Sequence, residues 1–255
     1  MIAAPTYESL CQDLEPDFFD YKKGRRTAPE ISGNMWLNVT AALSSSSFVM
    51  PKKVPLLNKV KMVGILFCQP SHKLSKEQII NNLGYYHHRS GSNIDFYCSG
   101  YGAYWDITEY PDMQKVCTVN GTDWYFSPFA FNKFREDMEK RSKWRYEGEV
   151  DLLLVNAKLE RNDKHICLDM TSAIDCKLEE MIRIGTITSV MSFFEDIFQY
   201  AEKQNGKDST WGFSDKLGAS HAGSALKRFV LSLLPGDLGK EAEKLQHLAI
   251  RDISS

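Results

Sequence analysis

The segment from Trp124 to Ala201 constrains the fold most strongly, because its pattern runs from helix through two strands to a second helix. Ser127-Pro128 is typical of a helix start, since serine caps free backbone N–H groups and proline fits the first turn. Val150–Val155 and His165–Met170 have the pattern of short strands, and their connection is too short for a helical crossover. We therefore predict that they pair antiparallel.

An apolar stripe at helical spacing follows this hairpin, with Ser189 as the expected N-cap. The stripe comprises Val190, Phe193, Phe194, Ile197, Phe198 and Ala201. Upstream, Val60–Phe67 and Ile94–Cys98 have the pattern of strands on either side of a helix. A capping-box pattern at Ser75 and Gln78 marks the expected start of that helix. Its expected buried face is Ile79, Ile80, Leu83 and Tyr86.

Residues 60–205 therefore predict an α/β core with a mixed sheet in the order β-α-β-α-β-β-α, with an extra hairpin expected around Val116–Val119. This order resembles a thioredoxin-like sandwich, and a Rossmann-like sheet with one reversed edge strand is the alternative. Residues 1–59 are expected to form an irregular basic leader. Residues 206–221 have the composition of a linker, and residues 222–255 predict a C-terminal helical hairpin.

The composition fits a globular protein without a membrane segment. Hydrophobic residues make up 43% of the chain and charged residues 25%. There is no apolar run of about 20 residues, the length that a membrane-spanning helix needs. No signal peptide is visible, and the six cysteines are scattered without a secreted-domain pattern. These features predict a cytoplasmic protein with reduced thiols.

Two regions outside the core favour contacts with partners. Residues 22–61 carry eight basic residues against one acidic residue, a net charge of +7. Lys22, Lys23, Arg25 and Arg26 are the candidates for contacts with nucleic acid, and a solvated leader is the alternative. In the C-terminal hairpin, the candidate interface with a protein partner or a second copy is Leu226, Phe229, Val230 and Leu233.

These two regions make a binding and assembly module the leading functional hypothesis, with the chain as an oligomer or a subunit of a larger protein or protein–nucleic-acid complex. Packing of the apolar helices on the α/β core is the alternative for the C-terminal region. An enzyme is the competing class of function, and its candidate residues lie in the hairpin of the core.

The enzyme hypothesis starts from carboxylates. Glu149 and Asp151 lie two residues apart on one expected strand, and Asp169 lies near the end of the next. Three carboxylates on one sheet face could hold Mg²⁺ for phosphodiester cleavage. This arrangement resembles the core of restriction-endonuclease-like nucleases, which carry an acidic residue, a spacer and a lysine on the second strand. Here Thr171 stands where that lysine belongs, and Lys177 lies further along. Strand-edge ion pairs with Lys or Arg are the alternative role for Glu149 and Asp151.

Three other candidates follow from loops and cysteines. Ser99, Gly100, Tyr101 and Gly102, together with Trp105, are candidate ligand-binding residues for a nucleotide at the end of a strand, with loop packing as the alternative. The stretch Cys68-Gln69-Pro70-Ser71 resembles the one-cysteine form of a thioredoxin motif. No zinc-binding spacing occurs, so no metal site is predicted, and no cofactor is expected apart from Mg²⁺ under the nuclease hypothesis.

Overall fold

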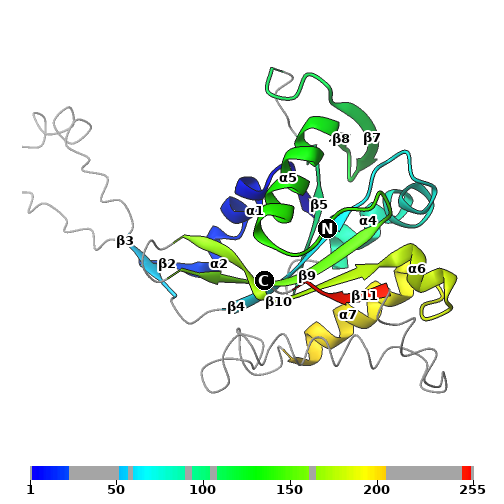
Figure 1. Ribbon diagram of the computed structural model, residues 1–255. Helices are drawn as coiled ribbons and strands as arrows, with labels where there is room; N and C mark the ends of the chain where they lie inside the picture. Colours follow the sequence, from blue (N-terminus) through cyan, green and yellow to red (C-terminus); the bar gives the residue numbers. More distant parts are fainter. Residues whose placement is uncertain are drawn as a thin grey trace, which may run out of the picture.

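A six-stranded mixed sheet lies at the centre of the computed structural model, in the order β1-β5-β4-β9-β10-β11 (Figure 1). The strands are β1 (Ile2–Ala4), β5 (Asp95–Ser99), β4 (Val60–Phe67), β9 (Asp151–Leu159), β10 (Ile166–Lys177) and β11 (Ile250–Asp252). The first three are mutually parallel, and each later strand is antiparallel to its neighbour. The structure describes residues 2–22, 52–56, 60–89, 94–103, 108–160, 165–204 and 249–253.

This arrangement confirms the α/β class, the parallel β4–β5 unit and the antiparallel β9–β10 hairpin. The narrower thioredoxin-like and Rossmann-like assignments stay predictions.

Helices cover both faces of the sheet. On one face lie α1 (Tyr7–Asp13) and α5 (Pro128–Arg141), and on the other lies α7 (Val190–Gln204) (Figure 1). Aromatic rings fix both layers. Phe67 of β4 packs against Phe131 and Phe134 of α5, with ring centroids 5.8 and 5.7 Å away. On the opposite face, Phe96 of β5 packs against Phe194 of α7, with centroids 4.9 Å apart.

Two of the three helix N-caps expected from the sequence, those at Ser127 and Ser189, form in the structure. The Ser127 hydroxyl accepts a hydrogen bond from the Ala130 N–H at 3.0 Å, and Ser189 accepts one from Ser192 at 3.1 Å. The capping box at Ser75 does not form. A π-helical turn (Ser75–Ile79) and a 3-10 turn (Ile80–Asn82) instead lead into α4 (Leu83–Arg89). The Gln78 side chain accepts a hydrogen bond from the Val190 N–H at 2.8 Å, so it supports the start of α7.

Both ends of the chain contribute edge strands that the sequence does not reveal. The expected irregular leader instead begins with β1, which pairs with β5, and continues into α1 and α2 (Glu15–Phe18). A separate ladder joins β2 (Phe19–Lys22) to β3 (Lys52–Pro55). At the other end, β11 pairs with β10. The expected linker and the helices of the C-terminal hairpin, residues 206–248, lie outside the described residues.

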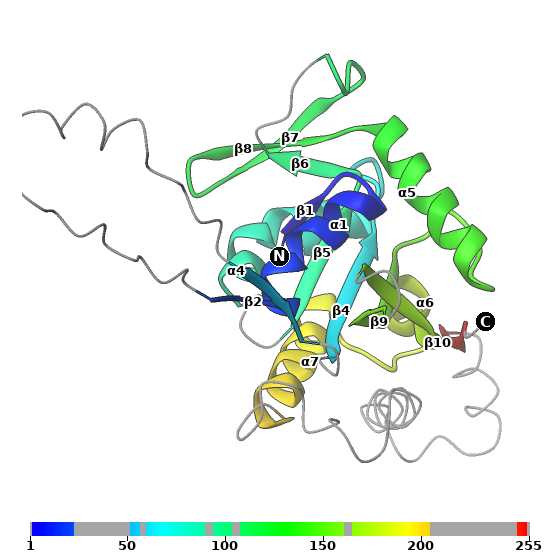
Figure 2. The same ribbon diagram turned by 90° about the vertical axis from the view of Figure 1, so that its left-hand side faces the viewer.

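A three-stranded antiparallel sheet lies beside the central one (Figure 2). It consists of β6 (Tyr101–Ala103), β8 (Thr122–Phe126) and β7 (Gln114–Val119). The turn between β7 and β8 uses Asn120 and Gly121, both with positive φ, as a tight hairpin requires. This sheet confirms the extra hairpin expected around Val116–Val119. Among the helices that the structure describes, none has the length and apolarity needed to cross a membrane.

Candidate active site

The structure does not bring Asp169 to Asp151. Asp169 lies opposite Asn156 of β9, and the register between β4 and β9 is continuous along this length. Asn156 and Asp151 are five positions apart in the same strand. Because side chains alternate between the two faces, an odd spacing places them on opposite faces, roughly 16 Å apart along the strand. Asp169 forms an ion pair with Lys158 at 3.0 Å. The expected cluster of Glu149, Asp151 and Asp169 is therefore not formed.

A register shift in β10 supplies a different partner for Asp151. Between Asp169 and Ile174 the strand advances by more residues than β9, and regular pairing then resumes. Lys177 consequently lies directly opposite Asp151, and Asp175 lies opposite Leu153. Asp151, Asp175 and Lys177 therefore share the sheet face that α5 covers, with Asp175 a diagonal neighbour of Asp151. Asp175-Cys176-Lys177 is the acidic residue, spacer and lysine missing after Asp169.

The two aspartates are buried, and each has an oxygen without a hydrogen-bond partner. Asp151 is 0% exposed and Asp175 is 1% exposed. The Trp144 indole N–H donates to Oδ2 of Asp151 at 3.1 Å. Oδ1 of Asp151 and Oδ1 of Asp175 accept no hydrogen bond. Because buried polar atoms are nearly always satisfied, two such oxygens on one face indicate a place for a positively charged ligand.

Burial also changes the protonation of this pair. It raises the pKa of Asp151 to about 6, with the negative charges of Glu149 and Glu147 adding to the effect. Burial raises the pKa of Asp175 well above its ordinary range, and the charge of Asp151 is the next cause. Lys177 opposes both shifts. Ionising both Asp151 and Asp175 is therefore unfavourable, and a further cation in the site would make it more favourable.

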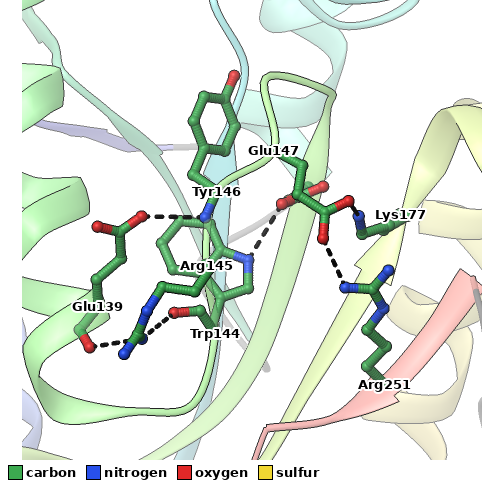
Figure 3. A network of polar contacts seen from close by, with 8 residues as sticks. Glu139, Trp144, Arg145, Tyr146, Glu147, Lys177 and Arg251 are labelled. Atoms are coloured by element: carbon green, nitrogen blue, oxygen red, sulfur yellow. Dashed lines mark hydrogen bonds and ion pairs between the residues drawn. The ribbon is translucent and has the colours of Figure 1, made fainter.

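Glu147 lies at the mouth of this site, between two cations (Figure 3). Its carboxylate forms an ion pair with Lys177, whose side chain is only 4% exposed. It also accepts a hydrogen bond from Nη1 of Arg251 at 2.8 Å. These two contacts lower the pKa of Glu147 to about 2. The Glu147 side chain is 49% exposed, so this carboxylate connects the buried groups with solvent.

The segment after α5 holds these groups in place. The Trp144 ring packs on Phe67 with centroids 4.4 Å apart, which aims its indole N–H at Asp151. The Tyr146 N–H donates to the Glu139 carboxylate at 3.0 Å, and Arg145 donates to the Glu139 carbonyl at 2.9 Å (Figure 3). Residues 144–147 are thereby tied to the end of α5, over the ends of β9 and β10. The sequence pattern did not reveal Trp144, Glu147 or Arg251 as site residues.

The expected glycine-rich turn is mostly strand, since Ser99 ends β5 and Tyr101 and Gly102 belong to β6. Ser99 donates to the Leu66 carbonyl at 2.9 Å, and the buried Tyr101 hydroxyl donates to the Cys68 carbonyl at 2.7 Å. Gly100 has φ of +75°, and a Cβ there would lie 2.5 Å from the Phe131 Cβ. Gly102 is also buried, whereas Trp105 lies outside the described residues. In the described part of this segment, these residues make packing contacts and hydrogen bonds to backbone carbonyls, and its nucleotide-binding role stays a prediction.

Cysteine and histidine are the other side chains considered for redox or metal chemistry, and Cys68 and His88 are among the described residues. Cys68 is buried, and all six cysteines are free. His88 lies 3.4 Å from the Asn120 side chain, as a loop partner. Within the described ranges, no group of three or more His, Cys, Asp or Glu side chains is placed to hold a metal ion.

Most of the proposed contact residues lie outside the described residues. Lys22 belongs to β2, whereas Lys23, Arg25 and Arg26 are not described. The candidate interface residues Leu226, Phe229, Val230 and Leu233 are not described either. Lys61, one of the eight basic residues counted over residues 22–61, is buried in β4 and pairs with Asp17 at 2.6 Å and with Asp95. Its charge therefore serves the core rather than a partner.

Comparison with known proteins finds no matching family model, no matching curated protein and no matching solved structure.

Proposed function

We propose that the protein is a divalent-cation-dependent phosphodiesterase that acts on nucleic acid, with Asp151, Asp175 and Lys177 as its catalytic residues. The observation that carries the proposal is the pair of buried carboxylate oxygens without hydrogen-bond partners, beside a buried lysine ammonium on one sheet face. The resemblance to restriction-endonuclease-like nucleases supports it in a revised register. Asp151 stands on the first strand of the hairpin, and Asp175-Cys176-Lys177 stands on the second.

The donor set fits a small hard cation. Mg²⁺ in proteins is usually held by one or two carboxylates and completes its shell with water and substrate phosphate oxygens. Oδ1 of Asp151 and Oδ1 of Asp175 are the two acceptors that the site offers. When bound, the cation would polarise a phosphoryl oxygen and lower the pKa of a bound water.

The chain's own residues then have separate tasks. Trp144 holds Oδ2 of Asp151, which leaves Oδ1 for the cation. The buried ammonium of Lys177 is placed to orient the attacking water and to stabilise negative charge on the phosphate in the transition state. Lys177 lies directly opposite Asp151 in the β9–β10 pair, so the two strands and not a loop fix the position of the ammonium relative to the carboxylate.

The binding and assembly function, and the nucleotide-binding alternative, stay predictions. The basic leader and the apolar C-terminal helices that motivate the first lie largely outside the described residues.

The proposal predicts metal-dependent cleavage by the purified full-length chain. Labelled single-stranded DNA, single-stranded RNA and duplex DNA are incubated with Mn²⁺, Mg²⁺ or EDTA, and products are resolved by denaturing electrophoresis. At least one substrate should be cut with a divalent cation and none in EDTA. Asp175→Asn should remove the activity, whereas Asp169→Asn, on the same strand but the opposite face, should keep it. Equal cleavage by wild type and Asp175→Asn, or none by wild type, would refute the assignment.

A further inference from the structure

Glu147 is held by two basic side chains that come from different strands. Lys177 stands at the end of β10, and Arg251 stands on β11, opposite Asp175. The register of both pairs places the two basic residues on the same face as the aspartates. Figure 3 shows the Glu147 carboxylate pointing between them. A carboxylate therefore occupies a position bounded by an ammonium and a guanidinium.

This position has the chemistry of a phosphate site. A guanidinium presents a planar set of N–H donors that matches carboxylate and phosphate oxygens alike, and a lysine ammonium adds a point charge. The Arg251 side chain is 38% exposed and that of Glu147 is 49% exposed, so the position can be reached from solvent. Lys177 is buried beneath them, beside the two aspartates.

Before a cation binds, Glu147 and a substrate phosphate compete for the same two basic groups. The site contains the carboxyl groups of Glu147, Asp151 and Asp175 but only the two basic groups of Lys177 and Arg251. A phosphodiester entering beside Glu147 would add another negative charge in a partly buried place, where like charges repel strongly. Gly148, with φ of +95°, follows Glu147 directly, so the residue lies next to a backbone turn rather than within a strand.

We propose that Glu147 occupies the position of a substrate phosphate, and that a backbone phosphate of the nucleic acid displaces it and binds Lys177 and Arg251. This inference rests on the proposed function, because it names the phosphate subsite of the same centre. Arg251 then acts as a substrate-positioning residue contributed by the C-terminal strand, and Glu147 competes with the substrate until the nucleic acid binds.

Binding without metal tests the inference separately from cleavage. The probe is a fluorescein-labelled 12-nucleotide oligodeoxythymidine, titrated with the full-length chain in EDTA and followed by fluorescence anisotropy. Glu147→Gln should tighten binding by about 5–10-fold, because the competing carboxylate is lost. Arg251→Ala added to that variant should abolish the gain. Glu149→Gln is the matched control, since it removes the same charge two residues away and should change the affinity less than about 2-fold.

An equal gain in oligonucleotide affinity for Glu147→Gln and Glu149→Gln would show that only net charge matters and would overturn the inference. Weaker binding by Glu147→Gln than by wild type would also overturn it. If the Glu147 variants do not fold, Arg251→Ala alone should weaken binding in the wild-type background, and unchanged affinity would overturn the inference. If the wild-type chain cleaves with metal but Glu147→Gln binds the oligonucleotide no more tightly than wild type, only the phosphate subsite is refuted. If Glu147→Gln binds the oligonucleotide more tightly but the wild-type chain cleaves no substrate, the phosphate subsite stands and the nuclease function is refuted.

Discussion

Replacing Lys177 by Met is expected to lower the rate of phosphodiester cleavage at saturating Mn²⁺ by about 10²–10³-fold, the usual cost of losing one charged stabilising group in an active site. Methionine keeps the length and flexibility of the side chain but removes the ammonium. The buried carboxylates remain, so Mn²⁺ binding should persist. The measurement is single-turnover cleavage of the substrate found for the wild-type chain, with folding checked by circular dichroism.

Lys158→Met provides the matched control for this experiment. Lys158 stands on the same hairpin and pairs with Asp169, but on the opposite face of the sheet. Its replacement should leave the single-turnover rate within about 2-fold of wild type, because Lys158 lies opposite Cys167, far along the hairpin from Asp151 and Lys177. If both lysine variants lose activity equally, the ammonium of Lys177 has no special role. If Lys177→Met cleaves at the wild-type rate, the catalytic assignment of Lys177 is wrong.

Phe67→Ala is expected to lower the free energy of unfolding by about 3–5 kcal/mol, as other deletions of a buried aromatic ring do. The Phe67 ring is fully buried and contacts Phe131 and Phe134 of α5 as well as Trp144. Removing it leaves a cavity between the sheet and the helix that positions the site. At about 2–4 °C per kcal/mol for a chain of this size, Tm should fall by roughly 6–20 °C in a thermal scan.

Phe129→Ala is the control, because Phe129 is 61% exposed at the start of α5. Its replacement should change the unfolding free energy by less than about 0.5 kcal/mol. A Tm for Phe67→Ala within about 2 °C of wild type would mean that the α5 layer is not packed on β4 as described. Reduced activity in this variant would not bear on the chemistry, since the packing around Trp144 also changes.

Long periodic segments could be predicted from the sequence, and short ones could not. The strands β4 and β9 carry long apolar runs, and α7 carries an apolar stripe at helical spacing. The edge strands β1 and β11 have three residues each, too few for alternation to be visible. Their pairing depends on neighbours far away in the chain. The sequence therefore predicts the centre of the sheet and misses its two edges.

The candidate site was only partly predictable, for a related reason. The sequence singles out Asp151 because it lies two residues from Glu149 on one expected strand and so shares its face. The second strand was expected to end at Met170, where the apolar run stops, but β10 continues to Lys177 through a register shift. That register shift depends on how β10 pairs with β9, and the local sequence pattern does not predict it. The signal that could have been used was Asp175-x-Lys177 itself, tested in each register that the hairpin allows.

The other members of the site come from separated segments. Trp144 and Glu147 lie in the connection after α5, and Arg251 lies near the C-terminus. Neither an indole N–H nor an isolated arginine indicates its partner from sequence alone. Only tertiary packing brings them to the ends of β9 and β10.

Calorimetric titration of Mn²⁺ into the full-length chain tests most directly whether Asp151 and Asp175 form a cation site. The account predicts saturable binding to the wild-type protein, loss of that binding in Asp175→Asn, and its retention in Asp169→Asn. Asp169 is equally buried and acidic, so it controls for non-specific binding to carboxylates. Binding of equal strength in Asp175→Asn and wild type, or no binding to the folded wild-type protein, would contradict the account.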